Sequence, residues 1–123
     1  DVVYNVESSH CYGDIDKFVK EVYRVLKEDG NFCWTDFRDE KTMKITQEIF
    51  LKAGFSIVSK KEITDQVITA LDMINDAKKE RISEFVPKSI RRSFETFAGV
   101  QGTPVYDSFQ SGKLKYYQYH LRK

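Results

Sequence analysis

Apolar residues recur along the first half of the chain with two different spacings. The apolar runs at residues 1–6, 31–36 and 55–62 have the length and composition of strands, and the first is expected to be buried. Between these runs, residues 15–26 and 40–53 carry apolar positions three and four apart, which is the spacing of one face of a helix. Strands that alternate with helices predict a parallel sheet with helices packed against it.

The alternating pattern stops after residue 63. Thr64 or Asp65 can cap a long helix that runs to about residue 85, and residues 89–97 predict a shorter helix. Thr103 followed by Pro104 is typical of a further helix start. The inward side of the long helix is expected to carry Val67, Leu71, Ile74 and Ile82. Residues 113–122 are rich in tyrosine and read as a final strand. We therefore predict an α/β core at residues 1–62, a helical insertion or lid at 63–112, and a final strand at 113–123.

The charges of the chain nearly cancel, because it has twenty Lys and Arg residues and nineteen Asp and Glu residues. Such a chain has no strong field for nucleic acid or an anionic membrane, so neither partner is expected. No apolar run approaches the roughly 20 residues that span a bilayer. Cys11 and Cys33 lack the spacing of a metal site, so no metal is expected, and free thiols indicate a reducing cytoplasm. Cys33 lies inside an apolar strand and is expected in the core.

Two segments carry a family resemblance. Residues 1–36 combine an apolar strand that starts at an Asp, a helix that ends in Arg-Val-Leu-Lys-Glu-Asp-Gly, and a further strand that ends at an Asp. They resemble the middle of class I S-adenosylmethionine-dependent methyltransferases, although the family's usual Pro-Gly before the last glycine is Glu-Asp here. The loop Asn-Val-Glu-Ser-Ser-His-Cys-Tyr at residues 5–12 resembles methyltransferases that modify hydroxyls on mycobacterial lipids, of the phthiotriol and glycopeptidolipid type, and more loosely sterol methyltransferases.

This resemblance implies both a fold and a further part of the domain. By it, the chain is the C-terminal half of a Rossmann-like, seven-stranded methyltransferase sheet, mostly parallel with one antiparallel strand, plus inserted helices. The final strand would then insert antiparallel between the strands near 31–36 and 55–61. The cofactor would be S-adenosylmethionine, but the glycine-rich turn that normally binds it has no counterpart in this sequence. Because the chain enters an apolar strand directly after Asp1, we expect the natural protein to supply an N-terminal half as a partner.

Methyl transfer from a sulfonium requires alignment of the reactants and often a base for the acceptor hydroxyl. Ligands of parallel sheets bind beyond the carboxyl ends of the strands, where the loop at residues 7–12 begins. His10 is the candidate base, because an imidazole titrates near neutral pH. Glu7 is a second catalytic candidate, which would orient His10 or face the cationic sulfonium. By the resemblance, Asn5, Val6 and Glu7 would also contact the cofactor.

Three further residues are candidates for binding a small-molecule or lipid-like acceptor. Tyr12 lies in the same loop as His10, and Asp36 and Arg38 lie at the end of the second strand. Each of them also has a purely structural interpretation. Tyr12 would pack, Asp36 would cap a helix, and Arg38 would pair with a neighbouring acidic residue.

Two other interpretations of the whole chain stay open. The first is a non-catalytic interaction module built from half of the methyltransferase fold. The second is a nicotinamide-dependent enzyme, since half of any dinucleotide-binding fold alternates strands and helices in the same way. The loop at residues 7–10 and the absence of a Tyr-x-x-x-Lys pattern argue against this second interpretation. Formation of a homo-oligomer is left open by the sequence.

Overall fold

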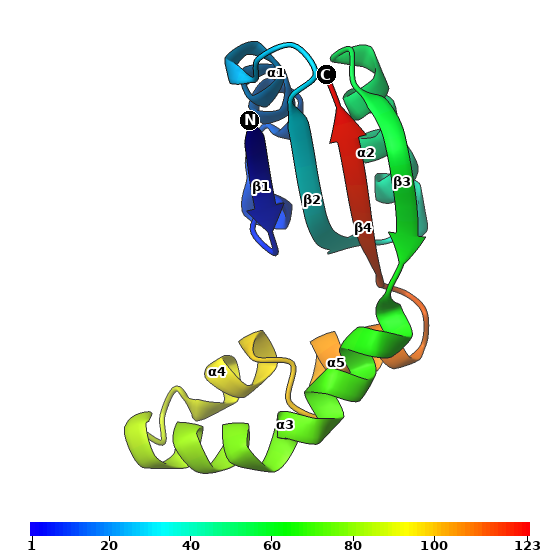
Figure 1. The fold of residues 1–123 in the computed structure, drawn as a ribbon. Helices are drawn as coiled ribbons and strands as arrows, with labels where there is room; N and C mark the ends of the chain where they lie inside the picture. Colours follow the sequence, from blue (N-terminus) through cyan, green and yellow to red (C-terminus); the bar gives the residue numbers. More distant parts are fainter. The chain divides into compact units, whose positions relative to one another are not determined.

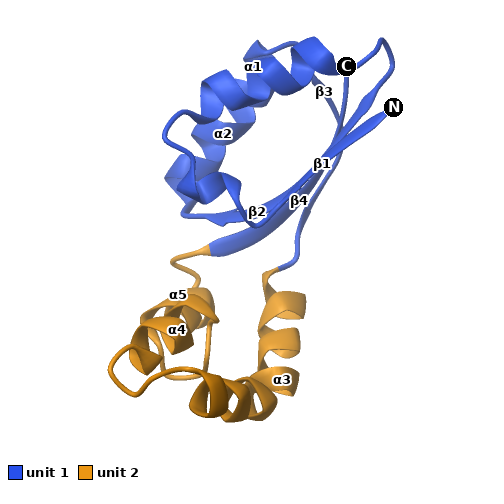
Figure 2. Cartoon of the chain, turned by 90° about the vertical axis from the view of Figure 1, so that its left-hand side faces the viewer, with its two compact units in different colours: residues 1–63, 115–123 blue, residues 64–114 orange.

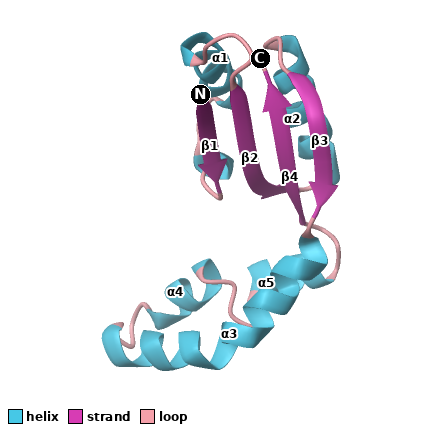
Figure 3. Ribbon diagram, in the orientation of Figure 1, coloured by secondary structure: helices cyan, strands magenta, loops and turns pink.

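The computed structural model describes all 123 residues, which form two compact units. Unit 1 comprises residues 1–63 and 115–123 and is blue in Figure 2, and unit 2 comprises residues 64–114 and is orange. Unit 1 contains the sheet with two helices, and unit 2 contains three helices (Figure 3). No helix in either unit has the length and apolar character that crossing a membrane requires.

A four-stranded sheet forms the centre of unit 1 (Figure 1). Its strands are β1 (Val2–Val6), β2 (Asn31–Arg38), β3 (Ser56–Glu62) and β4 (Lys115–Arg122), and they lie in the order β1-β2-β4-β3. β1 pairs parallel with β2, whereas β4 runs antiparallel to both β2 and β3. The predicted common direction of the first three strands and the insertion of the final strand between two of them are therefore confirmed.

Two helices cover one face of this sheet (Figure 2). The first, α1 (Ile15–Val25), begins where predicted, because the Asp14 side chain accepts a hydrogen bond from the Lys17 backbone N at 2.8 Å. The second, α2 (Glu40–Lys52), begins at Asp39, whose side chain accepts from the Thr42 backbone N at 2.9 Å. Each cap satisfies a backbone donor that the first turn of a helix cannot pair internally.

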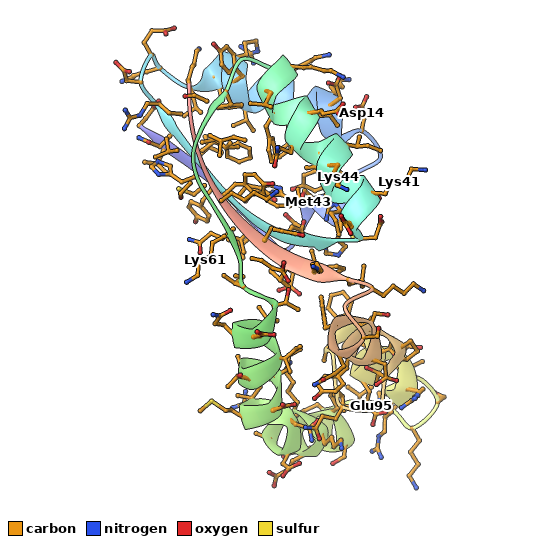
Figure 4. The ribbon with its side chains drawn as sticks, turned by 90° about the vertical axis from the view of Figure 1, so that its right-hand side faces the viewer. Asp14, Lys41, Met43, Lys44, Lys61 and Glu95 are labelled. Carbon is orange, nitrogen blue, oxygen red and sulfur yellow. The ribbon has the colours of Figure 1, made fainter.

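The core of unit 1 lies between these helices and the sheet. Trp34 of β2 and Tyr119 of β4 are fully buried, and each packs edge-on against Phe50 of α2 with ring centroids 5.5 Å apart. Edge-to-face contacts of this kind suit aromatic rings and add to the stabilisation from burial. Met43 points from α2 toward the sheet, whereas Lys41 points away from it (Figure 4).

The other face of the sheet carries no helix of unit 1 (Figure 2). Val2, Tyr4 and Val6 of β1 are 61%, 78% and 60% exposed on it, and Cys33 is exposed as well. The expectation that the first strand and Cys33 are buried is therefore wrong. Successive side chains of a strand point to opposite faces, and within unit 1 only one face is covered.

Unit 2 consists of α3 (Thr64–Phe85), α4 (Arg91–Phe97) and α5 (Pro104–Gln110). All three predicted helices are present, although α4 starts two residues later than expected. The expectation for Ile74 is wrong, because its side chain is 46% exposed. The inward position next to it belongs to Asn75, whose side-chain oxygen accepts a hydrogen bond from the Gln101 backbone N at 3.1 Å. The helix therefore directs Asn75, and not Ile74, toward the segment that follows α4.

Gly54 provides a test of the junction between α2 and β3. Its φ of 107° is rare for other residues, and a Cβ there would lie 2.8 Å from Cζ of Tyr23. We predict that Gly54→Ala lowers the free energy of unfolding by more than about 1 kcal/mol in urea titrations. Gly13→Ala is the control, with an expected change within about 0.5 kcal/mol, because nothing lies within 4 Å of its Cβ position. Equal losses in the two variants would contradict this assignment.

Candidate active site

The candidate site forms where β1 and β2 end, because parallel neighbours bring their carboxyl ends to the same edge of a sheet. After β1 the chain makes a short 3-10 turn, η1 (Ser9–Cys11), and β2 ends with Asp36, Phe37 and Arg38. The turn lies against the end of β2 and is joined to it by side-chain hydrogen bonds.

The central contact of the site joins His10 to Asp36. The His10 ring Nδ1 lies 2.8 Å from Oδ1 of Asp36, and the His10 backbone N donates to Oδ2 at 3.0 Å. The Asp36 side chain is fully buried, whereas the His10 side chain remains 24% exposed. One edge of the imidazole is therefore fixed by a buried carboxylate while the ring stays accessible.

Further donors surround the Asp36 carboxylate. The Ser9 hydroxyl donates to Oδ2 at 2.7 Å, the Phe37 backbone N donates to Oδ1 at 2.9 Å, and Arg38 Nη1 lies 3.3 Å from Oδ2. Burial alone would raise the pKa of Asp36, but the hydrogen bonds from Ser9, His10 and Phe37 and the charge of Arg38 outweigh it. The pKa of Asp36 is therefore lowered, and the group is an anion at neutral pH.

Ser9 connects this carboxylate to two more residues of β2. Its hydroxyl oxygen accepts from Nε1 of Trp34 and from Nη2 of Arg38, both at 2.9 Å. The guanidinium carbon of Arg38 lies 5.5 Å from the Trp34 ring centroid, a cation–π arrangement. Ser9 and Trp34 were not predicted as site residues, and only the position of Ser9 beside His10 in the loop could have suggested one of them.

The hydrogen bond to Asp36 selects one tautomer of the neutral imidazole. A carboxylate only accepts, so the ring proton lies on Nδ1, and Nε2 keeps the lone pair. This arrangement gives the exposed imidazole the capacity to take a proton from a hydroxyl. The Phe37 ring also packs against the imidazole, with the two ring centroids 4.4 Å apart.

Glu7 occupies a separate position in the same loop. Its backbone has a φ of 48°, and its backbone N donates to the Thr35 carbonyl at 2.8 Å. Its carboxylate is exposed, and together with burial it raises the pKa of the Tyr116 hydroxyl on β4. Sequence reasoning considered Glu7 as the group that orients His10, and in the structure Asp36 has that place. Tyr116 was not among the predicted site residues.

A third polar cluster links Asn5 to Tyr12. The Asn5 amide nitrogen donates to the Ser8 hydroxyl at 2.9 Å and to the Tyr12 hydroxyl at 3.0 Å. The Tyr12 ring packs edge-on against Phe18 with a centroid distance of 4.9 Å. Asn5 is 7% exposed, and its side-chain oxygen is buried without a hydrogen-bond partner. Val6 faces the open side of the sheet.

The chain is similar in sequence to known methyltransferases. It is 29% identical, over its whole length, to a phthiotriol/phenolphthiotriol dimycocerosates methyltransferase of Mycobacterium leprae, and 34% identical over 104 residues to a probable second enzyme of that name in Mycobacterium ulcerans. It is 27% identical over 119 residues to a fatty-acid O-methyltransferase of Mycolicibacterium smegmatis. The chain spans only 40–46% of the length of these relatives. No model of a protein family matches it.

Solved structures agree with this similarity. The whole chain superposes on 55% of the Mycobacterium tuberculosis cyclopropane synthase MmaA2, with a TM-score of 0.84 and 14% identity. It superposes with a TM-score of 0.80 and 15% identity on 52% of a sarcosine dimethylglycine methyltransferase from Galdieria sulphuraria, described as putative, with 99% of the chain covered. The chain is homologous to methyltransferases and has the fold of their C-terminal half. A related cyclopropane synthase, CmaA1, has been solved with S-adenosylhomocysteine, with a TM-score of 0.82.

The end of β1 fits part of such a cofactor. S-adenosylmethionine carries amino and hydroxyl donors, and the buried, unpartnered oxygen of Asn5 is an acceptor that such a donor would satisfy. The exposed carboxylate of Glu7 suits a cationic ligand. The side chains of Asn5 and Glu7 therefore have the chemistry that such a cofactor requires.

Asp36→Asn tests whether the buried carboxylate anchors the site. We predict that it lowers the free energy of unfolding by about 2–4 kcal/mol at pH 7, because Arg38 loses its buried counter-ion. Since the folded-state pKa of Asp36 is lowered, its stabilisation is complete above about pH 4 and disappears as the pH falls through the folded-state pKa. The free energies of unfolding of wild type and variant, measured by urea titration from pH 7 down to pH 2, should therefore converge as the pH falls.

The control for this comparison is Asp39→Asn. Asp39 is an exposed N-cap, and Asn caps a helix about as well as Asp, so this variant should change stability little. A difference between wild type and Asp36→Asn that does not change with pH would argue against an ionised Asp36 as the anchor.

Proposed function

We propose that this chain forms the acceptor-side half of an S-adenosylmethionine-dependent methyltransferase, which methylates a hydroxyl of a lipid-like or other small-molecule acceptor. The observation that carries this proposal is the His10–Asp36 pair at the carboxyl ends of two parallel strands. Its similarity to methyltransferases named for phthiotriol dimycocerosates and for fatty acids supports the reaction and the class of acceptor.

His10 acts as the general base in this proposal. When bound, the cofactor supplies a methyl group that a sulfonium makes electrophilic. Nε2 of His10 accepts the proton of the acceptor hydroxyl while the acceptor oxygen forms a bond to the methyl carbon, and the electron pair of the broken carbon–sulfur bond stays on sulfur. Asp36 stabilises the imidazolium that results, because its carboxylate is held beside Nδ1.

The remaining candidates have different roles around this base. Asp36 and Arg38 are buried, and their hydrogen bonds run to other residues of the chain, so they shape the acceptor site by holding His10. Tyr12 is 40% exposed, and in this proposal its exposed part borders the acceptor. Asn5, Val6 and Glu7 hold one side of the cofactor.

Unit 2 supplies an apolar surface that suits a lipid-like acceptor. Ser93, Phe94 and Phe97 line an open hollow of about 420 Å³, and Phe97 is largely exposed. The free energy falls when a long hydrocarbon chain leaves water and binds to such a surface. We propose that this surface of unit 2 contacts the hydrocarbon part of the acceptor.

The N-terminal half of the same domain is the partner in this proposal. β1 is an edge strand, so one row of its backbone donors and acceptors is unpaired, and three large apolar side chains of β1 are exposed beside it. A further strand would pair with these backbone groups, and its covering helices would bury the apolar side chains. The unpaired thiols of Cys11 and Cys33 suit a cytoplasmic enzyme.

His10→Ala in the full-length protein that contains this chain tests the base. We predict a fall in the single-turnover methylation rate by about 100- to 10,000-fold, with the calorimetric affinity for S-adenosylmethionine nearly unchanged. His120→Ala is the matched control. His120 contacts Asn31 on another part of the sheet, so this variant should retain the methylation rate of the wild type. Near-normal turnover by a His10→Ala protein with an unchanged melting temperature would exclude the base assignment.

A second prediction concerns the 123-residue chain by itself. We expect no useful affinity for S-adenosylmethionine, because the chain contacts one side of the cofactor and has no glycine-rich turn. Calorimetric titration of the isolated chain, beside the full-length protein as a positive control, checks this. Micromolar binding by the isolated chain would contradict it, and a full-length protein that binds no cofactor would favour a non-catalytic module.

A further inference from the structure

We propose that Ser9 is a positioning residue of this reaction. Its hydroxyl can donate only to Asp36, and this bond holds the Asp36 carboxylate against the His10 ring. The role of Ser9 rests on the proposed function, because His10 is the base of that reaction. Ser9 lies in η1 directly before His10 and is 2% exposed, so water has little access to its hydroxyl.

Every hydrogen-bonding position of the Ser9 hydroxyl has a partner within the chain. Its oxygen accepts from Nε1 of Trp34 and from Nη2 of Arg38, both at 2.9 Å, and it lies 2.7 Å from Oδ2 of Asp36. An indole N–H and a guanidinium only donate, and a hydroxyl has two lone pairs and one proton. Both lone pairs are therefore taken, and the proton is left to point toward Asp36.

This fixed direction orients the Asp36 carboxylate. Oδ2 receives the Ser9 hydroxyl and the His10 backbone N, the latter at 3.0 Å, and Oδ1 faces Nδ1 of the imidazole at 2.8 Å. Without the Ser9 hydroxyl, the N–H groups of Trp34 and Arg38 would lose their acceptor. Buried donors that lose an acceptor are costly, so they would attract the carboxylate of the same cluster. A carboxylate that turns toward them leaves Nδ1 without its partner.

The two donors to Ser9 belong to the rigid part of unit 1. Trp34 is fully buried and packs against Phe50 and Tyr119, and the guanidinium carbon of Arg38 lies 5.5 Å from the Trp34 ring centroid. Side chains in a close-packed core have little freedom to move. Ser9 therefore connects the partly exposed base to the core through one hydroxyl.

Ser9→Ala in the full-length protein that contains this chain tests this role with two readouts. With hexadecanol as the acceptor probe, we expect the single-turnover rate to fall about 10- to 100-fold, the loss typical when a residue that orients a histidine ligand is removed. The calorimetric affinity for S-adenosylmethionine should stay nearly unchanged. Nitrogen-15 shifts of the neutral His10 ring should change from a protonated Nδ1 to a mixture of both tautomers. A Ser9 that only stabilised the fold would lower the melting temperature and leave the tautomer unchanged.

Three further variants make this result specific. Ser9→Thr retains the hydroxyl and should keep most of the rate. Ser9→Ala added to Asp36→Asn should cause no further loss of rate, because Ser9 acts through Asp36. Thr46→Val is the matched control, since Thr46 is 1% exposed and its hydroxyl donates to the Thr42 carbonyl at 2.8 Å, on α2. It also removes one buried hydroxyl, but it should leave both the rate and the tautomer unchanged.

The outcomes separate the role of Ser9 from the proposed function. If Ser9→Ala does not fold, Ser9→Cys gives the same readouts, because a thiol fills a similar space but donates and accepts only weakly. An unchanged rate or an unchanged tautomer in the folded variant would overturn the role of Ser9 while the proposed function stands. Additive losses in the double variant would overturn it as well. If the wild type binds no S-adenosylmethionine, the proposed function fails, and the tautomer alone then decides whether Ser9 positions His10.

Discussion

The buried carboxylate of Asp36 is the group on which the geometry of the site depends. A charge taken out of water costs several kcal/mol unless donors surround it, and here the donors come from Ser9, His10, Phe37 and Arg38. Two of these residues lie in the loop after β1, and the others lie with Asp36 in β2. Satisfying the carboxylate therefore also fixes that loop, and the orientation of the His10 ring follows from it.

Two acidic residues at this edge of the sheet have different environments, and their proposed roles follow from the difference. Asp36 is buried and pairs with the cation of Arg38, so its charge holds His10 and is not available to a ligand. Glu7 is exposed and forms no ion pair with a basic side chain of the chain, so its charge remains available to a ligand.

Much of the fold could be predicted from the sequence, because helix spacing, caps and strand runs are properties of neighbouring residues. Asp14 caps α1 as its position suggested. Burial was less predictable, since an apolar run does not reveal which face of a sheet is covered, and Tyr4 and Cys33 proved exposed. The partners within the site depend on strand pairing. Asp36 reaches His10 across 26 residues only because β1 and β2 are parallel neighbours, and local reasoning considered the nearer Glu7 instead.

The central claim is that Asp36 holds His10 in the tautomer that leaves Nε2 free to accept a proton. Nitrogen-15 chemical shifts of the His10 ring, recorded where the imidazole is neutral, test it most directly. We expect a protonated Nδ1 and an unprotonated Nε2 in the wild type, and a mixture of both tautomers in Asp36→Asn, whose amide can donate as well as accept. A protonated Nε2 in the wild type would show that His10 cannot serve as the base.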